Sequence, residues 1–579
     1  MNLWKWLQSV VTLAATTAQN DAVGGTNVTI GGGSEQPPAG QHISSDELVV
    51  LDGAAADQLV DADDAKMQQG GGMGQAQQQM DDQGMSDQSN GSDEKEKVGT
   101  LPAAGQDDAD AASPKQTNGQ DTLNQAGSDK TNSPEPSRRP NVILLLAEDL
   151  GWGDLGSFGH PYAQTPTIDR LAEQGMKFTN FHAAGKTCSP ARAGIMTSRH
   201  PASMEGYSGD YGFQHLTTVS DLFRDAGYPA VGHFGKWHIG DDLEREDNIY
   251  GFTDVKKLSG CESAYWYKDE CVVDGALKFI EDNYQEPFFL NVWGHVAHSP
   301  IKPKQHLVDR FANINVDYSD FGYQFHDKLD KSKKLDKNLD RSMANYLGAL
   351  YSMDYNIARI LGMLDDLGIV NNTIVAFTGD HGAARIGAEE DSSTEQNMLG
   401  YCGGLRDYKH SYYEGGVRVP LIVKWPEIIP AGAVDDSPIS ALDWLPTIST
   451  LAQVPYKEKL FEGENFADVW LGGAGKNRSS PLFWNKEGSG DYAMLSEDGR
   501  WKLHFSVDDQ WELYDLRNNI EEDVNLVRCK KNIADRMKKQ LKEWTQTLPE
   551  KYCRLGKGCD PARFDKLDKG KDGDGPEKC

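Results

Sequence analysis

The stretch Asn-Val-Ile-Leu-Leu-Leu-Ala, residues 141–147, is apolar from its second residue onward and follows a proline-rich linker. An unbroken apolar run of this length is typical of a strand that is buried on both faces of a parallel sheet. Similar runs occur at residues 288–292 and 373–378, with a shorter one at 421–425. Segments with helical spacing, at 166–175 and 343–367, separate them. Strands that alternate with helices in this way predict an α/β domain built on a large sheet.

The pattern changes around residues 450–455. Short aromatic segments at 501–505 and 511–514 predict strands, and residues 532–548 have the spacing of an amphipathic helix. We therefore expect a main domain over residues 140–455 and a smaller C-terminal α+β domain over residues 456–550. Residues 551–579 are rich in Lys, Gly and Asp and predict a flexible tail.

The N-terminal quarter has a different composition. Residues 1–137 contain 21 Asp and Glu against 6 Lys, and large apolar residues are scarce after the first fifteen. Such a segment cannot bury enough apolar surface to offset its ordering entropy, so residues 19–139 are expected to be disordered. Residues 1–18, with Lys5 before a short apolar stretch, predict a signal peptide, and an ordinary disordered N-terminus is the alternative.

The remaining sequence agrees with a secretory route. No later segment is long and apolar enough to form an integral membrane helix. Four Asn-x-Ser/Thr sequons, at Asn27, Asn90, Asn371 and Asn477, would accept glycans on such a route. The net charge of −30 argues against a nucleic-acid partner, because phosphate binding needs a basic face.

Eight cysteines are present, and none forms a Cys-x-x-Cys pair of the kind that holds zinc. Cys261 with Cys271, and Cys553 with Cys559, are close enough in sequence to form local disulfides, although spacing alone does not establish either bond. Cys188 is different because it stands before Ser-Pro and four residues ahead of Arg192. Proline suits the first turn of a helix, where free N–H groups favour an electron-rich partner. A lone cysteine of this kind would more often be buried or disulfide-bonded.

Cys188 is accompanied by six other segments that carry chemistry. In chain order the seven segments are Ala-Glu-Asp-Leu-Gly-Trp-Gly-Asp at 147–154, Thr-Cys-Ser-Pro-Ala-Arg at 187–192, Gly-Lys-Trp-His-Ile-Gly at 235–240, His-Val-Ala-His-Ser-Pro at 295–300, Thr-Gly-Asp-His-Gly at 378–382, Lys409 with Glu-Gly-Gly-Val-Arg-Val-Pro at 414–420, and Glu-Leu-Tyr-Asp-Leu at 512–516. Over roughly residues 140–550 the chain thus resembles the sulfatase family, of the formylglycine-dependent arylsulfatase type. The resemblance implies an alkaline-phosphatase-like fold: a large mixed sheet flanked by helices.

The resemblance also implies a cofactor. Glu148, Asp149 and Asp380 are carboxylates, which suit a hard, oxygen-bound cation. One Ca²⁺ per chain is implied, with His381 and the modified Cys188 completing the ligand set. Glu148 stands where the family usually has Asp, and His381 where many members have Asn. Because a nitrogen ligand is softer, Mg²⁺ and Mn²⁺ stay open.

In the family, the cysteine is oxidised to formylglycine, so a formylglycine-generating enzyme is an implied partner of Cys188. One hydroxyl of the hydrated aldehyde attacks sulfur, and the other expels sulfate when the aldehyde re-forms. His295 is interpreted as a possible structural histidine, and Glu414 with Arg418 as an internal brace for the Lys409 segment. The implied roles of the other residues are a sulfate clamp for Lys236 and Lys409, orientation of the aldehyde for Arg192, proton removal during sulfate release for His238, and proton donation to the leaving alcohol for His298.

The sequence therefore predicts a sulfuric-ester hydrolase, acting on an aryl or carbohydrate sulfate, either a small molecule or a polysaccharide. It is expected to be secreted or to reside in a secretory or lysosome-like compartment. A phosphonate or phosphate mono- or diester hydrolase of the same superfamily is one alternative. A non-catalytic extracellular scaffold, with the acidic segment as its working part, is another.

Overall fold

The computed structural model describes residues 139–576, apart from 214–215, 241–249, 262–267, 386–398, 486–490, 507, 555–557, 562–566 and 568–569. The described residues belong to one compact unit. The predicted signal peptide, the predicted disordered segment up to residue 138, and the sequons at Asn27 and Asn90 lie outside them.

The strand β1 (Asn141–Ala147) lies inside a nine-stranded sheet and pairs in parallel with β5 (Phe288–Trp293) and β6 (Thr373–Gly379). On the far side of β6, β7 (Arg418–Lys424) runs antiparallel to both β6 and β2 (Met176–His182), so the sheet is mixed. The strand order is β4-β3-β5-β1-β6-β7-β2-β8, with β9 also on β2; the remaining bounds are β3 (Ala230–Gly235), β4 (Asp254–Lys257), β8 (Ala433–Asp435) and β9 (Ile439–Ser440). The predicted α/β fold with a large mixed sheet is confirmed.

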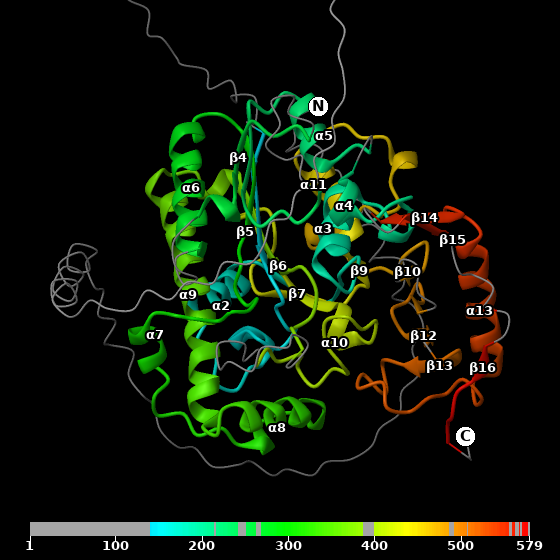
Figure 1. Ribbon diagram of the computed structural model, residues 1–579. Helices are drawn as coiled ribbons and strands as arrows, with labels where there is room; N and C mark the ends of the chain where they lie inside the picture. Colours follow the sequence, from blue (N-terminus) through cyan, green and yellow to red (C-terminus); the bar gives the residue numbers. More distant parts are fainter. Residues whose placement is uncertain are drawn as a thin grey trace, which may run out of the picture. The chain divides into compact units, whose positions relative to one another are not determined.

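Helices cover both faces of this sheet (Figure 1). Ile143 and Leu145 of β1 share a core with residues of α2 (Pro166–Gln174), α6 (Lys268–Asn283) and α9 (Leu339–Asp366). Val142 and Leu144 share another with residues of α3 (Cys188–Thr197), α5 (Val219–Asp225) and α11 (Trp444–Leu451). Because successive side chains of a strand point to opposite faces, burial of both faces requires the unbroken apolar run of β1. None of the described helices is both long and apolar enough to cross a membrane.

A second sheet has five strands in the order β10-β11-β12-β13-β16. Their bounds are β10 (Leu482–Asn485), β11 (Tyr492–Leu495), β12 (Trp501–Phe505), β13 (Gln510–Asp515) and β16 (Lys571–Asp572). α13 (Lys531–Thr545) packs on one face through Met537 and Leu541, and the other face shares a core with Tyr412 and Val417 of the segment before β7. The smaller sheet is thereby held against the larger one, although the proposed domain boundary at residue 455 stays a prediction.

Strands also occur where the composition had indicated a flexible tail. β14 (Lys551–Arg554) pairs with β15 (Gly558–Pro561), and β16 adds to β13 in parallel. Gly206 forms a bridge with Cys553, so β14 lies beside the segment that follows α3. These contacts are made by the backbone, and for that reason the polar composition of residues 551–579 gave no sign of them.

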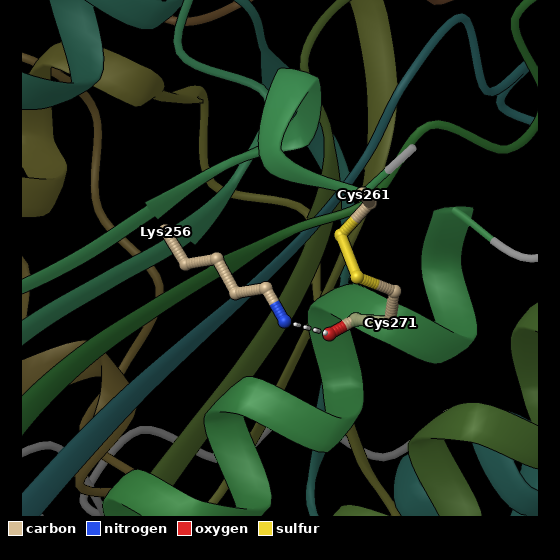
Figure 2. The surroundings of a disulfide bond; sticks show 3 residues. All are labelled: Lys256, Cys261 and Cys271. Atoms are coloured by element: carbon tan, nitrogen blue, oxygen red, sulfur yellow. Dashed lines mark hydrogen bonds between the residues drawn. A yellow bond between two sulfur atoms is a disulfide. The ribbon is translucent and has the colours of Figure 1, made fainter. Parts of the chain in front are cut away.

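The Cys261–Cys271 disulfide forms, as the spacing allowed (Figure 2). It joins the end of the β4 segment to α6, where Lys256 donates a hydrogen bond to the carbonyl of Cys271 at 3.2 Å. Cys529 and Cys553 each take part in a disulfide as well. The side chain of Cys559, the proposed partner of Cys553, lies outside the described residues, although the two face each other across the β14–β15 pair.

Candidate active site

Four of the predicted metal ligands meet at the ends of two neighbouring strands. Glu148 and Asp149 follow β1, and Asp380 and His381 follow β6, whose last residue pairs with the last residue of β1. The backbone N–H of Asp149 donates to Oδ1 of Asp380 at 3.1 Å. All four side chains are buried. The parallel pairing of β1 with β6 is thus what brings carboxylates more than two hundred residues apart into one site.

Cys188 is the first residue of α3 and points into this site. Its Sγ lies 3.2 Å from Nε2 of His381 and 3.3 Å from Oε1 of Glu148. Burial, together with the charges of Asp380 and Asp149, raises the pKa of the Cys188 thiol to about 12. An unmodified thiol therefore stays protonated at neutral pH and is a poor nucleophile there.

Arg192 lies one turn further along α3 and is fully buried. Its Nε and Nη2 donate to Oδ2 of Asp380 at 3.1 and 2.9 Å, and its Nη1 donates to the carbonyl of Lys236 at 2.8 Å. Although burial opposes ionisation of Asp380, the charges of His381 and Arg192 outweigh it and hold the pKa of Asp380 well below its usual value. Arg192 thus fixes a predicted metal ligand and does not line the pocket described below.

Two lysines neutralise the other carboxylates. Nζ of Lys409 donates to both oxygens of Asp149, at 2.8 and 3.0 Å, and Lys236 forms an ion pair with Glu148. Burial lowers the pKa of Lys236 to about 8. Burial acts in the same direction on Lys409, but the charge of Asp149 prevails and raises the pKa of its ammonium group. Both cations therefore lie beside the carboxylates, where an anionic group could also reach them.

The donor set fits a hard divalent cation. Ligand atoms of Asp149, Cys188 and His381 lie within 4.8 Å of one another, as do those of Glu148, Cys188 and Asp380. Oε2 of Glu148 is buried and accepts no hydrogen bond from any described residue. Three buried carboxylates, one of them with an oxygen that accepts no hydrogen bond from a described residue, match the oxygen-rich coordination that Ca²⁺ prefers.

The histidines are placed differently from one another. Nε2 of His298 lies 3.8 Å from Oε1 of Glu148, and its Nδ1 lies 2.6 Å from the carbonyl of Ser299. His295 lies on the same segment, with Nδ1 3.4 Å from Oε2 of Glu148. His238 is exposed, has a left-handed backbone conformation with φ of 60°, and makes no hydrogen bond to another described residue. His298 and His295 thus contact a predicted metal ligand, whereas His238 does not.

Asp269, which the sequence did not single out, holds the histidine segment in place. Its carboxylate accepts hydrogen bonds from the backbone N–H groups of His295 and Val296, at 2.6 and 3.1 Å. Asp269 lies in the first turn of α6, two residues before the disulfide-bonded Cys271. No local motif marks such a residue, because its role depends on where α6 packs.

Above Cys188 opens a cavity of about 440 Å³. His238, His298 and Lys409 line it together with Cys188. The walls are completed by residues that no sequence motif marks, among them Lys186, Tyr207, His410, Phe483, Trp484 and Arg554. The cavity size is that of a small-molecule or oligosaccharide site, and Cys188 is one of its lining residues.

Glu414 and Arg418 lie away from this cavity. Glu414 is buried, accepts from Nη1 of Arg418 at 3.0 Å and lies 3.1 Å from Nε2 of His182. It also forms an ion pair with Lys502 of β12. These contacts link the main sheet to the smaller sheet, and the expected bracing of the Lys409 segment stays a prediction.

Comparison with known proteins adds an independent observation. Residues 140–454 match the family model named Sulfatase, and residues 404–547 match that of the C-terminal region of N-sulphoglucosamine sulphohydrolase. The N-acetylgalactosamine-6-sulfatase of Canis lupus familiaris is 30% identical over 450 residues, which cover 69% of this chain and 77% of that protein.

Two solved structures share the fold. The structure of Ps i-CgsB in complex with k-i-k-neocarrahexaose has a TM-score of 0.59 at 22% identity, and covers 71% of this chain and 94% of its own. The phosphonate monoester hydrolase of Agrobacterium radiobacter has a TM-score of 0.54 at 18% identity, and covers 73% and 100%. At these identities the likeness concerns the fold alone. The family model spans more than half of the chain and includes Cys188 and the clustered carboxylates, and the chain accordingly belongs to the sulfatase family and is a sulfuric-ester hydrolase.

Proposed function

We propose that this sulfuric-ester hydrolase removes sulfate from carbohydrate sulfates, with Cys188, oxidised to formylglycine, as its nucleophile. The observation that carries the proposal is the position of Cys188, which contacts Glu148 and His381 and lines the cavity. A carbohydrate substrate is supported by the relative named N-acetylgalactosamine-6-sulfatase. An aryl sulfate stays an alternative within the same chemistry.

The divalent cation, which we propose to be Ca²⁺, would be held by Glu148, Asp149, Asp380, His381 and the modified Cys188. When bound it would supply positive charge that favours the ionised form of the nucleophile and neutralises sulfate oxygens. Arg192 keeps Asp380 ionised and oriented through its two hydrogen bonds. Because Mg²⁺ demands a more regular geometry than Ca²⁺, the extra methylene of Glu148 is better accommodated by Ca²⁺.

Lys236 and Lys409 are proposed to bind the sulfate group of the substrate. Each is a compact cation with three donors, and Lys409 lines the cavity beside Cys188. His238, which is exposed and lines the cavity, is proposed to take the proton that must leave when sulfate is released. Its lack of hydrogen bonds among the described residues leaves both ring nitrogens available for that transfer.

His298 is proposed to protonate the departing alcohol. Its Nδ1 donates to the carbonyl of Ser299, so Nε2 is the nitrogen that faces Glu148 and the reaction centre. Burial, with the charges of Lys236 and Lys409, lowers the pKa of His298 to about 3. The negative charge of a bound sulfate ester partly neutralises the charges of both lysines. Substrate binding therefore favours the protonated form of His298 that a general acid needs.

The proposed maturation has a direct test. Trypsin should release residues 187–192 from active protein, lighter than encoded by the difference between a CH₂SH group and an aldehyde. A formylglycine-generating enzyme is the expected maturation partner. Protein produced without that enzyme should fold but be nearly inactive. Fully active protein that carries only unmodified Cys188 would contradict the mechanism.

A phosphonate or phosphate ester hydrolase is the second candidate, favoured by the fold that the chain shares with the phosphonate monoester hydrolase of Agrobacterium radiobacter. A panel of aryl sulfates, sugar sulfates and the matching phosphate esters separates the two. We expect kcat/KM to be highest for sulfates, and higher values for the phosphate esters would favour the second candidate.

We further propose a secreted or lysosome-like location. The two described sequons fit it, because Asn371 and Asn477 are both exposed and accessible to glycan attachment. Protein secreted by eukaryotic cells should carry a glycan on each of these two residues. Removal of both glycans by an N-glycosidase would support this location. Protein retained in the cytosol would contradict it.

A further inference from the structure

The charge of the cavity differs from the charge of the chain. Three full cations line it, namely Lys186, Lys409 and Arg554, together with four histidines, and no Asp or Glu is among the described lining residues. The chain as a whole carries a net charge of −30. A cavity of about 440 Å³ also exceeds what one sulfate group would fill. The cavity is therefore suited to a ligand with more negative charge than the scissile sulfate alone.

The three cations are not equally available. Lys409 is paired with Asp149 beside the nucleophile, and Lys186 is paired with Asp491 while its ammonium lies 3.9 Å from the centre of the Tyr412 ring. Arg554 is different, because its side chain is 42% exposed and, among the described residues, its only hydrogen bond runs from Nε to Oδ2 of Asp210 at 2.8 Å. Its two terminal amino groups donate to no described residue.

The guanidinium plane of Arg554 is held from two sides. Its central carbon lies 3.9 Å from the centre of the Tyr207 ring, and Asp210 fixes its Nε edge. Stacking on an aromatic face together with one ion pair leaves the other edge of the guanidinium plane for an anionic group. That edge carries the two amino groups that bind a carboxylate or sulfate in a paired arrangement.

The backbone that carries Arg554 is equally fixed. The N–H of Tyr207 donates to the carbonyl of Cys553 at 3.0 Å, and the N–H of Cys553 donates to the carbonyl of Glu205 at 2.9 Å. Cys553 is also disulfide-bonded. Arg554 thus reaches the cavity from a strand that is tied down on both sides, and binding a ligand there costs little additional ordering.

We infer that Arg554 binds a second anionic group of the substrate, carried by the sugar next to the one that bears the scissile sulfate. The substrate is accordingly a polyanionic carbohydrate, and the second group is a uronate carboxylate or a further sulfate ester. The inference rests on the proposed function and adds to it the class of polysaccharide that the cavity selects. Arg554 contacts the substrate but takes no part in bond breaking.

Three disaccharides test this inference. All contain N-acetylgalactosamine 6-sulfate, joined to a uronic acid, to a second sulfated sugar, or to a neutral sugar. We expect the wild-type protein to prefer one or both charged partners over the neutral one, as measured by kcat/KM. A hydrogen-bonded ion pair of this kind corresponds to a preference of roughly 10- to 100-fold. Whether the uronic acid or the second sulfate is preferred identifies the anionic group.

Arg554→Gln should abolish this preference, mainly through a higher KM for the charged disaccharides. Arg554→Lys, which keeps the charge but loses the paired donors, should retain part of it. Arg528→Gln is the matched control, because Arg528 is an exposed arginine that pairs with Asp574 and does not line the cavity. It should keep the wild-type preference. The preference is a ratio of two kcat/KM values measured on one protein. A partial loss of β14 structure that lowers both values equally therefore does not change it.

Equilibrium binding of the same disaccharides to Cys188→Ala protein separates this inference from the proposed function. Binding that favours the charged partners and depends on Arg554 supports the inference even if no disaccharide is hydrolysed. Equal affinity for all three, or a preference that survives Arg554→Gln, overturns it, whether or not the protein has sulfatase activity. Increasing salt should weaken the preference, because Arg554 is partly exposed.

Discussion

Two hydrogen bonds join the guanidinium of Arg192 to a single oxygen of Asp380, at 3.1 Å from Nε and 2.9 Å from Nη2, where neither side chain reaches solvent. Removing one partner of a buried ion pair leaves an uncompensated charge and typically costs about 3–5 kcal/mol. We therefore expect Arg192→Met to lower the free energy of unfolding by that order. Denaturant unfolding in the presence of a chelator measures it. Added Ca²⁺ should stabilise the variant more than the wild type, and equal stability in chelator would contradict the prediction.

The metal site should tolerate one substitution and not others. Glu148→Asp should be mild, because the ligand shell of Ca²⁺ adapts to small changes in carboxylate position. Asp149→Ala and Asp380→Ala should each reduce kcat by about 100-fold or more, since a catalytic cation supplies several kcal/mol. Activity measured against free Ca²⁺ tests this. Unchanged activity of Asp149→Ala would remove the proposed site.

His298 should matter in proportion to the basicity of the leaving group. General acid catalysis contributes on the order of 100- to 10,000-fold. We expect His298→Ala to lose activity near the upper end of that range on a sugar sulfate, and much less on nitrophenyl sulfate, whose leaving group departs without a proton. His238→Ala should slow both substrates alike, since sulfate release is common to them. Equal losses from His298→Ala would assign the proton donor to another residue, with Lys409 the next to test.

The strands and the site residues were predictable for different reasons. β1, β5 and β6 are buried on both faces, so their sequences are continuous apolar runs that can be recognised without the fold. Cys188 was identifiable because its motif and six others occur in order. The structure then brings Cys188, Glu148 and His381 into contact, which the sequence could state only through resemblance.

Asp269 and Arg554 show what the sequence could not supply. Asp269 acts through backbone N–H groups of a distant segment, and its position depends on how α6 packs. Arg554 lies in a polar segment whose strand is made by backbone pairing, with no apolar periodicity to reveal it. Both roles arise from long-range contacts, which composition and local spacing do not encode.

Acid should destabilise the fold through buried neutral histidines. Burial lowers the pKa of His160 and of His233 to about 3 in each case, from an unfolded value near 6.5. Because the folded pKa is depressed, the unfolded chain takes up the proton first as the pH falls. Their stabilising contribution is complete above pH 6.5 and is lost progressively between pH 6.5 and about 3.

Each such histidine contributes a slope of about 1.4 kcal/mol per pH unit in that window. His233→Phe should make the slope shallower by this amount, since the ring lies among Trp237, Phe252 and Trp293, where an apolar ring also fits. Urea unfolding at several pH values between about 4 and 8 measures the slope of the unfolding free energy against pH. Identical slopes for the variant and the wild type would show that His233 does not control acid stability.

The Cys261–Cys271 disulfide should stabilise both the fold and the histidine segment. Its ten-residue separation corresponds to roughly 2–3 kcal/mol from loop closure in the unfolded chain. The double variant Cys261→Ser, Cys271→Ser should lose about that much. Because α6 carries Asp269, activity should also fall at a lower temperature than global unfolding. Coincident loss of activity and of structure would argue against this link.

The contact between Arg554 and Asp210 joins residues 344 positions apart in the sequence. During synthesis, the two core-forming faces of the main sheet are available long before this strand leaves the ribosome. Closing so long a loop adds a late and slow step to folding. A nascent or prematurely terminated chain can thus contain Cys188, the carboxylates and the lysines of the site without Arg554. Substrate selection would then be the last property that the folding chain acquires.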